Sequence, residues 1–241
     1  LREKYDKQEV YITMRDGVKL FTSIYTPKNS ASAHPMLLNR TPYNIEAGGP
    51  SGINVFMQVY TRYTDNDYIM VFQDVRGKFM SEGVFEDIRP VLPVRKSNSD
   101  IDETTDTWDT VDWLVKNVKN NNGNVGIFGI SYPGFYSTMG IINSHPAVKA
   151  VSPQAPVTDW FIGDDFHHNG AFFLLDCFPF YYRFGQPRKE LSRSGKPSFI
   201  WPTPDNYDFF LSLGAIKNIA PKYFGDSIKF WNDVFAHPDY D

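Results

Sequence analysis

Residues 124–134, with the sequence NVGIFGISYPG, combine residue types that suit nucleophilic catalysis. An apolar run ends at Gly129, Ser131 follows two positions later, and a helical pattern begins directly after it. A serine hydroxyl can attack an ester or amide carbonyl and form an acyl-enzyme. A tight turn from a strand into a helix holds such a hydroxyl above a sheet, and the start of the helix presents amide N–H groups to a developing oxyanion. The segment therefore predicts Ser131 as a nucleophile.

The segment departs from a strict G-x-S-x-G motif. Pro133 stands at the position of the second glycine, and Gly134 follows one place later. The alternative reading of Ser131 is a helix N-cap, which needs no particular strand before it. The apolar run before the serine favours the catalytic reading.

A serine in such a turn can act only if a sheet and helices hold it in place. Two β-prone runs, 10–13 and 19–25, flank Asp16-Gly17, which predicts a hairpin with a type I′ turn. Short apolar runs of strand length, typical of buried parallel strands, follow at residues 36–38, 68–72, 125–128 and 147–151.

Helical patterns alternate with these runs. One stripe consists of Trp108, Val111, Val115 and Val118, and a second of Phe135, Met139 and Ile142. Each is the pattern of a helix that packs one face on a core. Strands that alternate with helices predict an α/β fold with a doubly wound, mostly parallel sheet.

The pattern changes after about Asp159. Residues 172–241 are rich in aromatics and prolines and lack strand–helix alternation, with candidate helices at 209–219 and 228–235. We therefore expect an N-terminal hydrolase-type domain over residues 1–160 and the start of a helical cap over residues 161–241.

Composition excludes some classes of function. The 241 residues are 41% hydrophobic with a formal net charge of −4, and no basic stripe suggests a nucleic-acid partner. No apolar run is long enough to span a bilayer. The single cysteine, Cys177, lies in an apolar stretch that predicts a buried side chain. No metal-ligand spacing or cofactor motif is found, and the adjacent His167 and His168 should point apart.

Several segments together resemble the X-Pro dipeptidyl-peptidase / cocaine esterase family of serine hydrolases. They are the GISYPG run at 129–134, NRTPYN at 39–44, QDVRG at 73–77 with SEG at 81–83, and TDTWDTVDWL at 105–114. Within that family, HPAVK at 145–149, Asp159 and GDDFHHNGAF at 163–172 are most similar to α-amino acid ester hydrolases and to proteins called glutaryl-7-aminocephalosporanic acid acylases. The resemblance implies an α/β-hydrolase fold.

The resemblance also implies roles for individual residues. The Tyr132 backbone N–H and the Tyr43 hydroxyl would form the oxyanion hole, and Asp165 would bind the α-ammonium of the substrate. The alternatives are an ordinary loop tyrosine at Tyr43 and a surface or helix-capping aspartate at Asp165. We expect Asp74 and Arg76 to hold a loop together through an internal ion pair.

The resemblance places the triad acid and histidine after the cap. None of the histidines that follow Ser131, which are His145, His167, His168 and His237, occupies that place. We therefore expect this chain to be the N-terminal part of a longer polypeptide that adds the acid, the histidine and a C-terminal jelly-roll domain. By resemblance that polypeptide is a homo-oligomer. The resemblance is consistent with a periplasmic or secreted location, and a cytoplasmic location stays open.

The sequence thus predicts a serine hydrolase that cleaves, and by resemblance also transfers, acyl groups of α-amino acid esters or β-lactam amides through an acyl-enzyme on Ser131. Its partner is a small ester or amide substrate, with no cofactor and no metal. Two alternatives stay open. One is a general esterase, acylase or X-Pro dipeptidyl-peptidase of the same family, and the other is a non-catalytic, hydrolase-like binding protein.

Overall fold

The computed structural model describes residues 1–28, 32–45, 48–49, 51–160 and 165–237. The chain divides into two compact units. The first comprises Leu1–Val157 and Leu191–Arg193, and the second comprises Thr158–Glu190 and Ser194–Asp241. The sequence prediction placed its boundary after residue 160.

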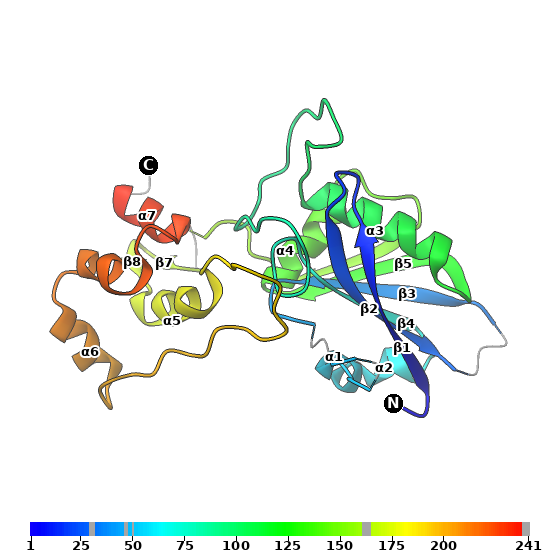
Figure 1. Ribbon diagram of the computed structural model, residues 1–241, viewed down its shortest axis with the longest axis horizontal. Helices are drawn as coiled ribbons and strands as arrows, with labels where there is room; N and C mark the ends of the chain where they lie inside the picture. Colours follow the sequence, from blue (N-terminus) through cyan, green and yellow to red (C-terminus); the bar gives the residue numbers. More distant parts are fainter. Residues whose placement is uncertain (29–31, 46–47, 50, 161–164, 238–241) are drawn as a thin grey trace. The chain divides into compact units, whose positions relative to one another are not determined.

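The first unit is built on a mixed, mostly parallel six-stranded sheet (Figure 1). The strands are β1 Tyr5–Thr13, β2 Lys19–Pro27, β3 His34–Thr41, β4 Ile69–Asp74, β5 Asn121–Ile130 and β6 Val148–Gln154, in the order β1-β2-β4-β3-β5-β6. The pairs β3–β4, β3–β5 and β5–β6 are parallel, whereas β1–β2 and β2–β4 are antiparallel. The predicted α/β fold with a mostly parallel sheet is confirmed.

The β1–β2 hairpin has a different turn from the predicted type I′. Gly17 has a positive φ of 88°, while Asp16 is not among the residues with positive φ. Met14 N–H donates to Val18 O, and Gly17 N–H donates to Met14 O. The connection is a three-residue loop that ends in a left-handed glycine, because a type I′ turn would need positive φ at two successive residues.

Helices cover both faces of this sheet. The helices α3 Glu103–Asn117 and α4 Tyr132–Met139 lie on one face, and the short α1 Val55–Val59 and α2 Thr61–Thr64 lie on the other (Figure 1). One core cluster packs Val111 and Leu114 of α3 against apolar strand residues, and a second packs Met57 of α1 against the opposite sheet face. The chain thus buries β3, β4 and β5 between two apolar layers, and Ser131 follows β5 directly.

The two predicted helical stripes are only partly right. In α3, Val111 is buried but Trp108 lies half-buried against His145, with ring centroids 4.8 Å apart. The buried side of the N-terminal half of α3 is polar, because it faces a cluster of ion pairs described below. The stripe after Ser131 is wrong at Ile142, which lies beyond the end of α4 and is 37% exposed.

The second unit is a small helical body with a core of aromatic side chains. Its elements are β7 His167–His168, β8 Ala171–Phe172, α5 Leu174–Phe184, α6 Asn206–Leu213, the 3₁₀ turn Ile216–Asn218, the π turn Ala220–Phe224 and α7 Lys229–Ala236. The prediction missed α5, which contains Pro179. Cys177 is fully buried beside Phe178, as predicted. Among the described residues, no helix has the length and apolar character of a membrane span.

Candidate active site

Ser131 occupies a strained position between β5 and α4. It is an exposed N-cap residue with φ 62° and ψ −123°, a conformation that residues with a Cβ rarely adopt. Such strain costs about 1–3 kcal/mol and persists only when the surroundings enforce it. The Ser131 N–H donates to Gln154 O of β6 at 3.0 Å, so the edge of the sheet fixes the turn.

Close packing at Gly129 explains why the turn needs a glycine there. A Cβ built at Gly129 would lie 2.1 Å from the backbone oxygen of Pro133 in the first turn of α4. At Gly134 a Cβ would lie 2.7 Å from Gln154 O, at the end of β6. The second glycine of the G-x-S-x-G motif is thus displaced by one residue, to Gly134. It still packs so closely on the end of β6 that a side chain would not fit there.

The two residues predicted to supply the oxyanion donors contact each other through their rings in the first unit. Tyr132 is the first residue of α4 and its side chain is fully buried. The ring of Tyr43 meets the ring of Tyr132 edge to face, with centroids 6.3 Å apart, and Tyr43 is 44% exposed. The turn that carries Tyr43 is held by its backbone N–H, which donates to Thr41 Oγ1 at 3.1 Å.

Asp74 supports the same turn. Its carboxylate is fully buried at the end of β4 and accepts hydrogen bonds from the backbone N–H of Ile45 at 3.0 Å and of Met80 at 3.4 Å. The expected ion pair between Asp74 and Arg76 is wrong, because Arg76 pairs with other carboxylates. Asp74 instead ties two loop amides to the end of a central strand.

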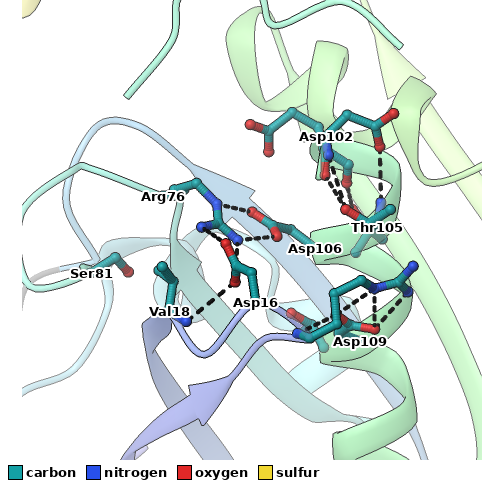
Figure 2. Close-up of polar contacts among 12 residues, drawn as sticks. Asp16, Val18, Arg76, Ser81, Asp102, Thr105, Asp106 and Asp109 are labelled. Atoms are coloured by element: carbon teal, nitrogen blue, oxygen red, sulfur yellow. Dashed lines mark hydrogen bonds and ion pairs between the residues drawn. The ribbon is translucent and has the colours of Figure 1, made fainter. Parts of the chain in front are cut away.

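Arg76 bridges the β1–β2 turn and helix α3 (Figure 2). Its guanidinium lies 2.7 Å from Asp16 Oδ2 and 2.7 Å from Asp106 Oδ1, and the side chain is 4% exposed. Burial opposes the charge on Arg76, but the hydrogen bonds to Asp106 and Asp16 raise its pKa overall. The pKa of Asp16 is lowered, because the bond from Arg76 and backbone N–H groups outweigh burial.

A second buried pair joins β3 to α3. Arg40 Nη1 lies 3.2 Å from Glu103 Oε2, and its guanidinium also lies over the ring of Tyr136 at 5.5 Å. Burial raises the pKa of Glu103 to about 7, although Arg40 acts in the opposite sense. Arg40 lies three residues before Tyr43, and Tyr136 stacks on Tyr132 with centroids 5.3 Å apart. The pair therefore supports the elements that carry both predicted oxyanion donors.

Sequence reasoning did not single out Glu103 or Arg40 as support for the site. Arg40 stands in one of the segments that resemble the family, but nothing local marks its partners on α3, which lie more than 60 residues away. Glu103 has the sequence appearance of an ordinary first-turn carboxylate.

Asp165 lies in the second unit, two residues before β7, and its side chain is exposed. The alternative of a helix cap is wrong, because the next helix, α5, begins after Phe173. Gly163 and Asp164 of the same motif lie outside the described residues. His167 is buried and His168 is exposed, so the two side chains diverge as predicted. No group of metal-binding side chains is found in the described part of the chain.

The two histidines of the first unit serve elsewhere. His34 begins β3, at the opposite end of the sheet from the turn after β5. The ring of His145 meets the ring of Trp108 edge to face, and His145 Nε2 lies 3.6 Å from Asp112 Oδ1. Within the described residues, the Ser131 hydroxyl makes no hydrogen bond to either of them.

Comparisons with known proteins identify the family of this chain. The family model of the X-Pro dipeptidyl-peptidase (S15 family) matches residues 16–240. A cocaine esterase of Rhodococcus sp. (strain MB1 Bresler) is 30% identical over 165 residues, which cover 67% of this chain and 25% of that protein.

Two solved structures match 99% of this chain at 37% identity. They are an aminopeptidase from a marine sediment Thaumarchaeota archaeon, with a TM-score of 0.85, and an α-amino acid ester hydrolase, with a TM-score of 0.82. The chain spans 39% and 38% of the lengths of these two structures. The chain belongs to the X-Pro dipeptidyl-peptidase (S15) family of hydrolases.

Proposed function

We propose that the protein carrying this chain cleaves acyl groups from α-amino acid esters or β-lactam amides, and transfers them, through an acyl-enzyme on Ser131. The observation that supports this most is the conformation of Ser131, a non-glycine residue at φ 62° between a buried strand and a helix. Strain of this kind concentrates at functional sites. An ordinary N-cap serine has extended backbone angles and uses its side chain to cap the helix, whereas Ser131 makes no such cap bond.

The proposed chemistry assigns one task each to Ser131, Tyr132 and Tyr43. The Ser131 oxygen attacks the substrate carbonyl while a general base takes its proton, and the carbonyl oxygen becomes an oxyanion. The Tyr132 backbone N–H and the Tyr43 hydroxyl would stabilise that oxyanion, which in related sites is worth about 3–4 kcal/mol per donor. The leaving group departs with a proton, and water or an amine then attacks the acyl-enzyme.

We expect the general base and its acid partner to come from a part of the full-length protein that follows the cap. The second unit would then be the start of a cap domain, and the complete protein would be a homo-oligomer. A periplasmic or secreted location of the complete protein is part of the same proposal.

Substrates with a free α-amino group are favoured by two relatives. Both the aminopeptidase and the α-amino acid ester hydrolase, each 37% identical to this chain, have names that denote substrates with an amino group next to the scissile carbonyl. Asp165 is the residue that we propose to pair with that ammonium. A single exposed carboxylate is a weak site, so further acidic groups would have to complete it.

The similarity to the cocaine esterase supports a second candidate function, an esterase whose substrates need no α-ammonium group. An X-Pro dipeptidyl-peptidase of the same family is a further alternative, and a non-catalytic binding protein is another. These candidates differ in whether Ser131 is required and in whether the α-amino group of the substrate matters.

The test compares phenylglycine methyl ester with phenylacetic acid methyl ester on the full-length gene product that contains this chain. The two esters differ only in the α-amino group. We expect a strong preference for the amino ester, no activity in Ser131→Ala, and loss of the preference in Asp165→Asn. Asp176→Asn, at another exposed aspartate of the second unit, is the matched control. Equal rates for the two esters would establish the general esterase, and full activity in Ser131→Ala would refute the proposal.

A further inference from the structure

The fully buried side chain of Tyr132 ends in two hydrogen bonds to a neighbouring loop. Its hydroxyl donates to Asp87 Oδ1 at 2.6 Å and accepts from the backbone N–H of Ile88 at 2.8 Å. The proposed function gives a role to the backbone of Tyr132 only, and none to Asp87. Both contacts come from consecutive residues of one loop, 45 and 44 positions away in the chain.

These contacts fix the ring firmly. A hydrogen bond to a carboxylate is stronger than one between neutral groups and has better-defined geometry. Burial, and then the neighbouring Tyr136 and Asp87, raise the pKa of Tyr132 well above its usual value, so the phenol keeps its proton and stays a donor. The ring has no alternative position at this depth, because close packing surrounds it.

The ring of Tyr132 is also the surface on which Tyr43 rests. Tyr43 meets it edge to face at 6.3 Å, and Phe85, from the same loop as Asp87, packs at 6.3 Å. A shift of the Tyr132 ring would therefore displace the Tyr43 ring and would turn the backbone of the first residue of α4. These are the two groups from which the proposed oxyanion hole is built.

We infer that Asp87 is a positioning residue of the catalytic site, which sets the places of both oxyanion donors by holding the Tyr132 hydroxyl. Asp87 acts through Tyr132 and touches no substrate. The inference rests on the proposed function, because it assigns Asp87 a task in the same site.

The test is a double-mutant cycle in the full-length gene product. The variants are Asp87→Ala, Tyr132→Phe and their combination, with Asp87→Asn as the conservative replacement. The matched control is Glu86→Ala, because this neighbouring carboxylate is 53% exposed and its ion pair is with Arg89 of the same loop, not with Tyr132. The readouts are kcat and KM for an ester substrate, together with the melting temperature.

If Asp87 positions the site, Asp87→Ala lowers kcat about tenfold or more while KM changes less than about twofold, because misplaced transition-state donors affect the chemical step. Tyr132→Phe gives a loss at least as large, because it also removes the acceptor of the Ile88 N–H. The combined variant is no slower than the slower single variant, because both single variants break the same Asp87–Tyr132 hydrogen bond. Asp87→Asn retains an acceptor oxygen and keeps most of the activity. Glu86→Ala matches the wild type.

The inference is overturned if Asp87→Ala keeps the kcat of Glu86→Ala, or if the losses of the two single variants multiply. Should Asp87→Ala fail to fold, Tyr132→Phe decides, since it removes one oxygen atom only, and a normal kcat there overturns the inference. Ser131→Ala distinguishes failure of the proposed function from failure of the positioning role of Asp87. Activity in Ser131→Ala refutes the proposed function, whereas an inactive Ser131→Ala beside normal Asp87 variants refutes the positioning role alone.

Discussion

A methyl group at Gly129 should disable the site while the rest of the sheet stays in place. The Cβ of Gly129→Ala would lie 2.1 Å from Pro133 O and 2.3 Å from Pro133 C, both backbone atoms of α4. Real Cβ contacts are essentially never shorter than 3.0 Å, so the first turn of α4 must move by about 0.9 Å. Tyr132 begins that turn, and its N–H would move with it.

The magnitude follows from this displacement. A shift of about 1 Å in a catalytic group can lower the rate about 100-fold, and overpacking costs about 1–3 kcal/mol of stability. Gly126→Ala is the matched control on the same strand. Its Cβ would meet Leu37 Cδ2 at 2.7 Å, which is the end of a side chain that can rotate away. We therefore expect kcat/KM for an ester substrate to fall about 100-fold in Gly129→Ala and less than about threefold in Gly126→Ala.

The assay is steady-state ester hydrolysis, with urea unfolding of both variants to measure stability. The reasoning fails if Gly129→Ala retains activity within threefold of Gly126→Ala while both stay folded. It also fails if a structure of Gly129→Ala shows α4 unmoved, because the displacement is the whole basis of the predicted loss.

Three further predictions concern the groups that support the site. Arg76→Leu should lower the free energy of unfolding by about 3–5 kcal/mol in urea unfolding at neutral pH, because it removes the guanidinium paired with the buried Asp106 carboxylate. The control Arg15→Leu should lower it by only about 1 kcal/mol, because the Arg15 side chain is 28% exposed. Glu103 has a pKa raised from 4.5 to about 7, so the folded state binds the extra proton between these values and stability falls as pH rises through about 7. Relative to Glu103→Gln, the wild type should lose at most about 1.4 kcal/mol per pH unit in that window, and parallel unfolding curves from pH 5 to 8 would contradict this. Asp74→Ala leaves two loop amides without their acceptor and should cost about 2–3 kcal/mol and lower kcat, and unchanged kcat in a folded variant would contradict the support of the Tyr43 turn.

Much of the first unit could be predicted because its signals are local. Buried parallel strands are short apolar runs, and all four predicted runs became strands of the sheet. The turn at Ser131 could be predicted for the same reason, because strand, serine and helix lie within eleven consecutive residues. Strand order, in contrast, depends on contacts between distant segments, and nothing in β4 itself places it between β2 and β3.

The polar half of α3 could not be predicted, because its pattern is that of an exposed helix. Glu103 and Asp106 are buried only because Arg40 and Arg76 reach them from distant segments. The start of α3, in contrast, depends on an interaction between residues that are close in the sequence. Asp102 caps α3 and its carboxylate accepts from the backbone N–H groups of Thr104 and Thr105, an interaction confined to four residues (Figure 2).

The strained turn at Ser131 requires support that the turn itself does not contain. A residue at φ 62° and ψ −123° raises the free energy of the folded state by about 1–3 kcal/mol, so neighbouring contacts must offset it. Those contacts are the bond from Ser131 N–H to β6, the packing of Gly129 on α4 and the hydrogen bonds of the Tyr132 hydroxyl. Each of these contacts involves a different segment, which is β6, the first turn of α4 or the loop at Asp87, so together they offset the strain. Loss of one should therefore alter the geometry of the turn and the rate of catalysis before it unfolds the sheet, which is the pattern that separates a positioning contact from a merely stabilising one.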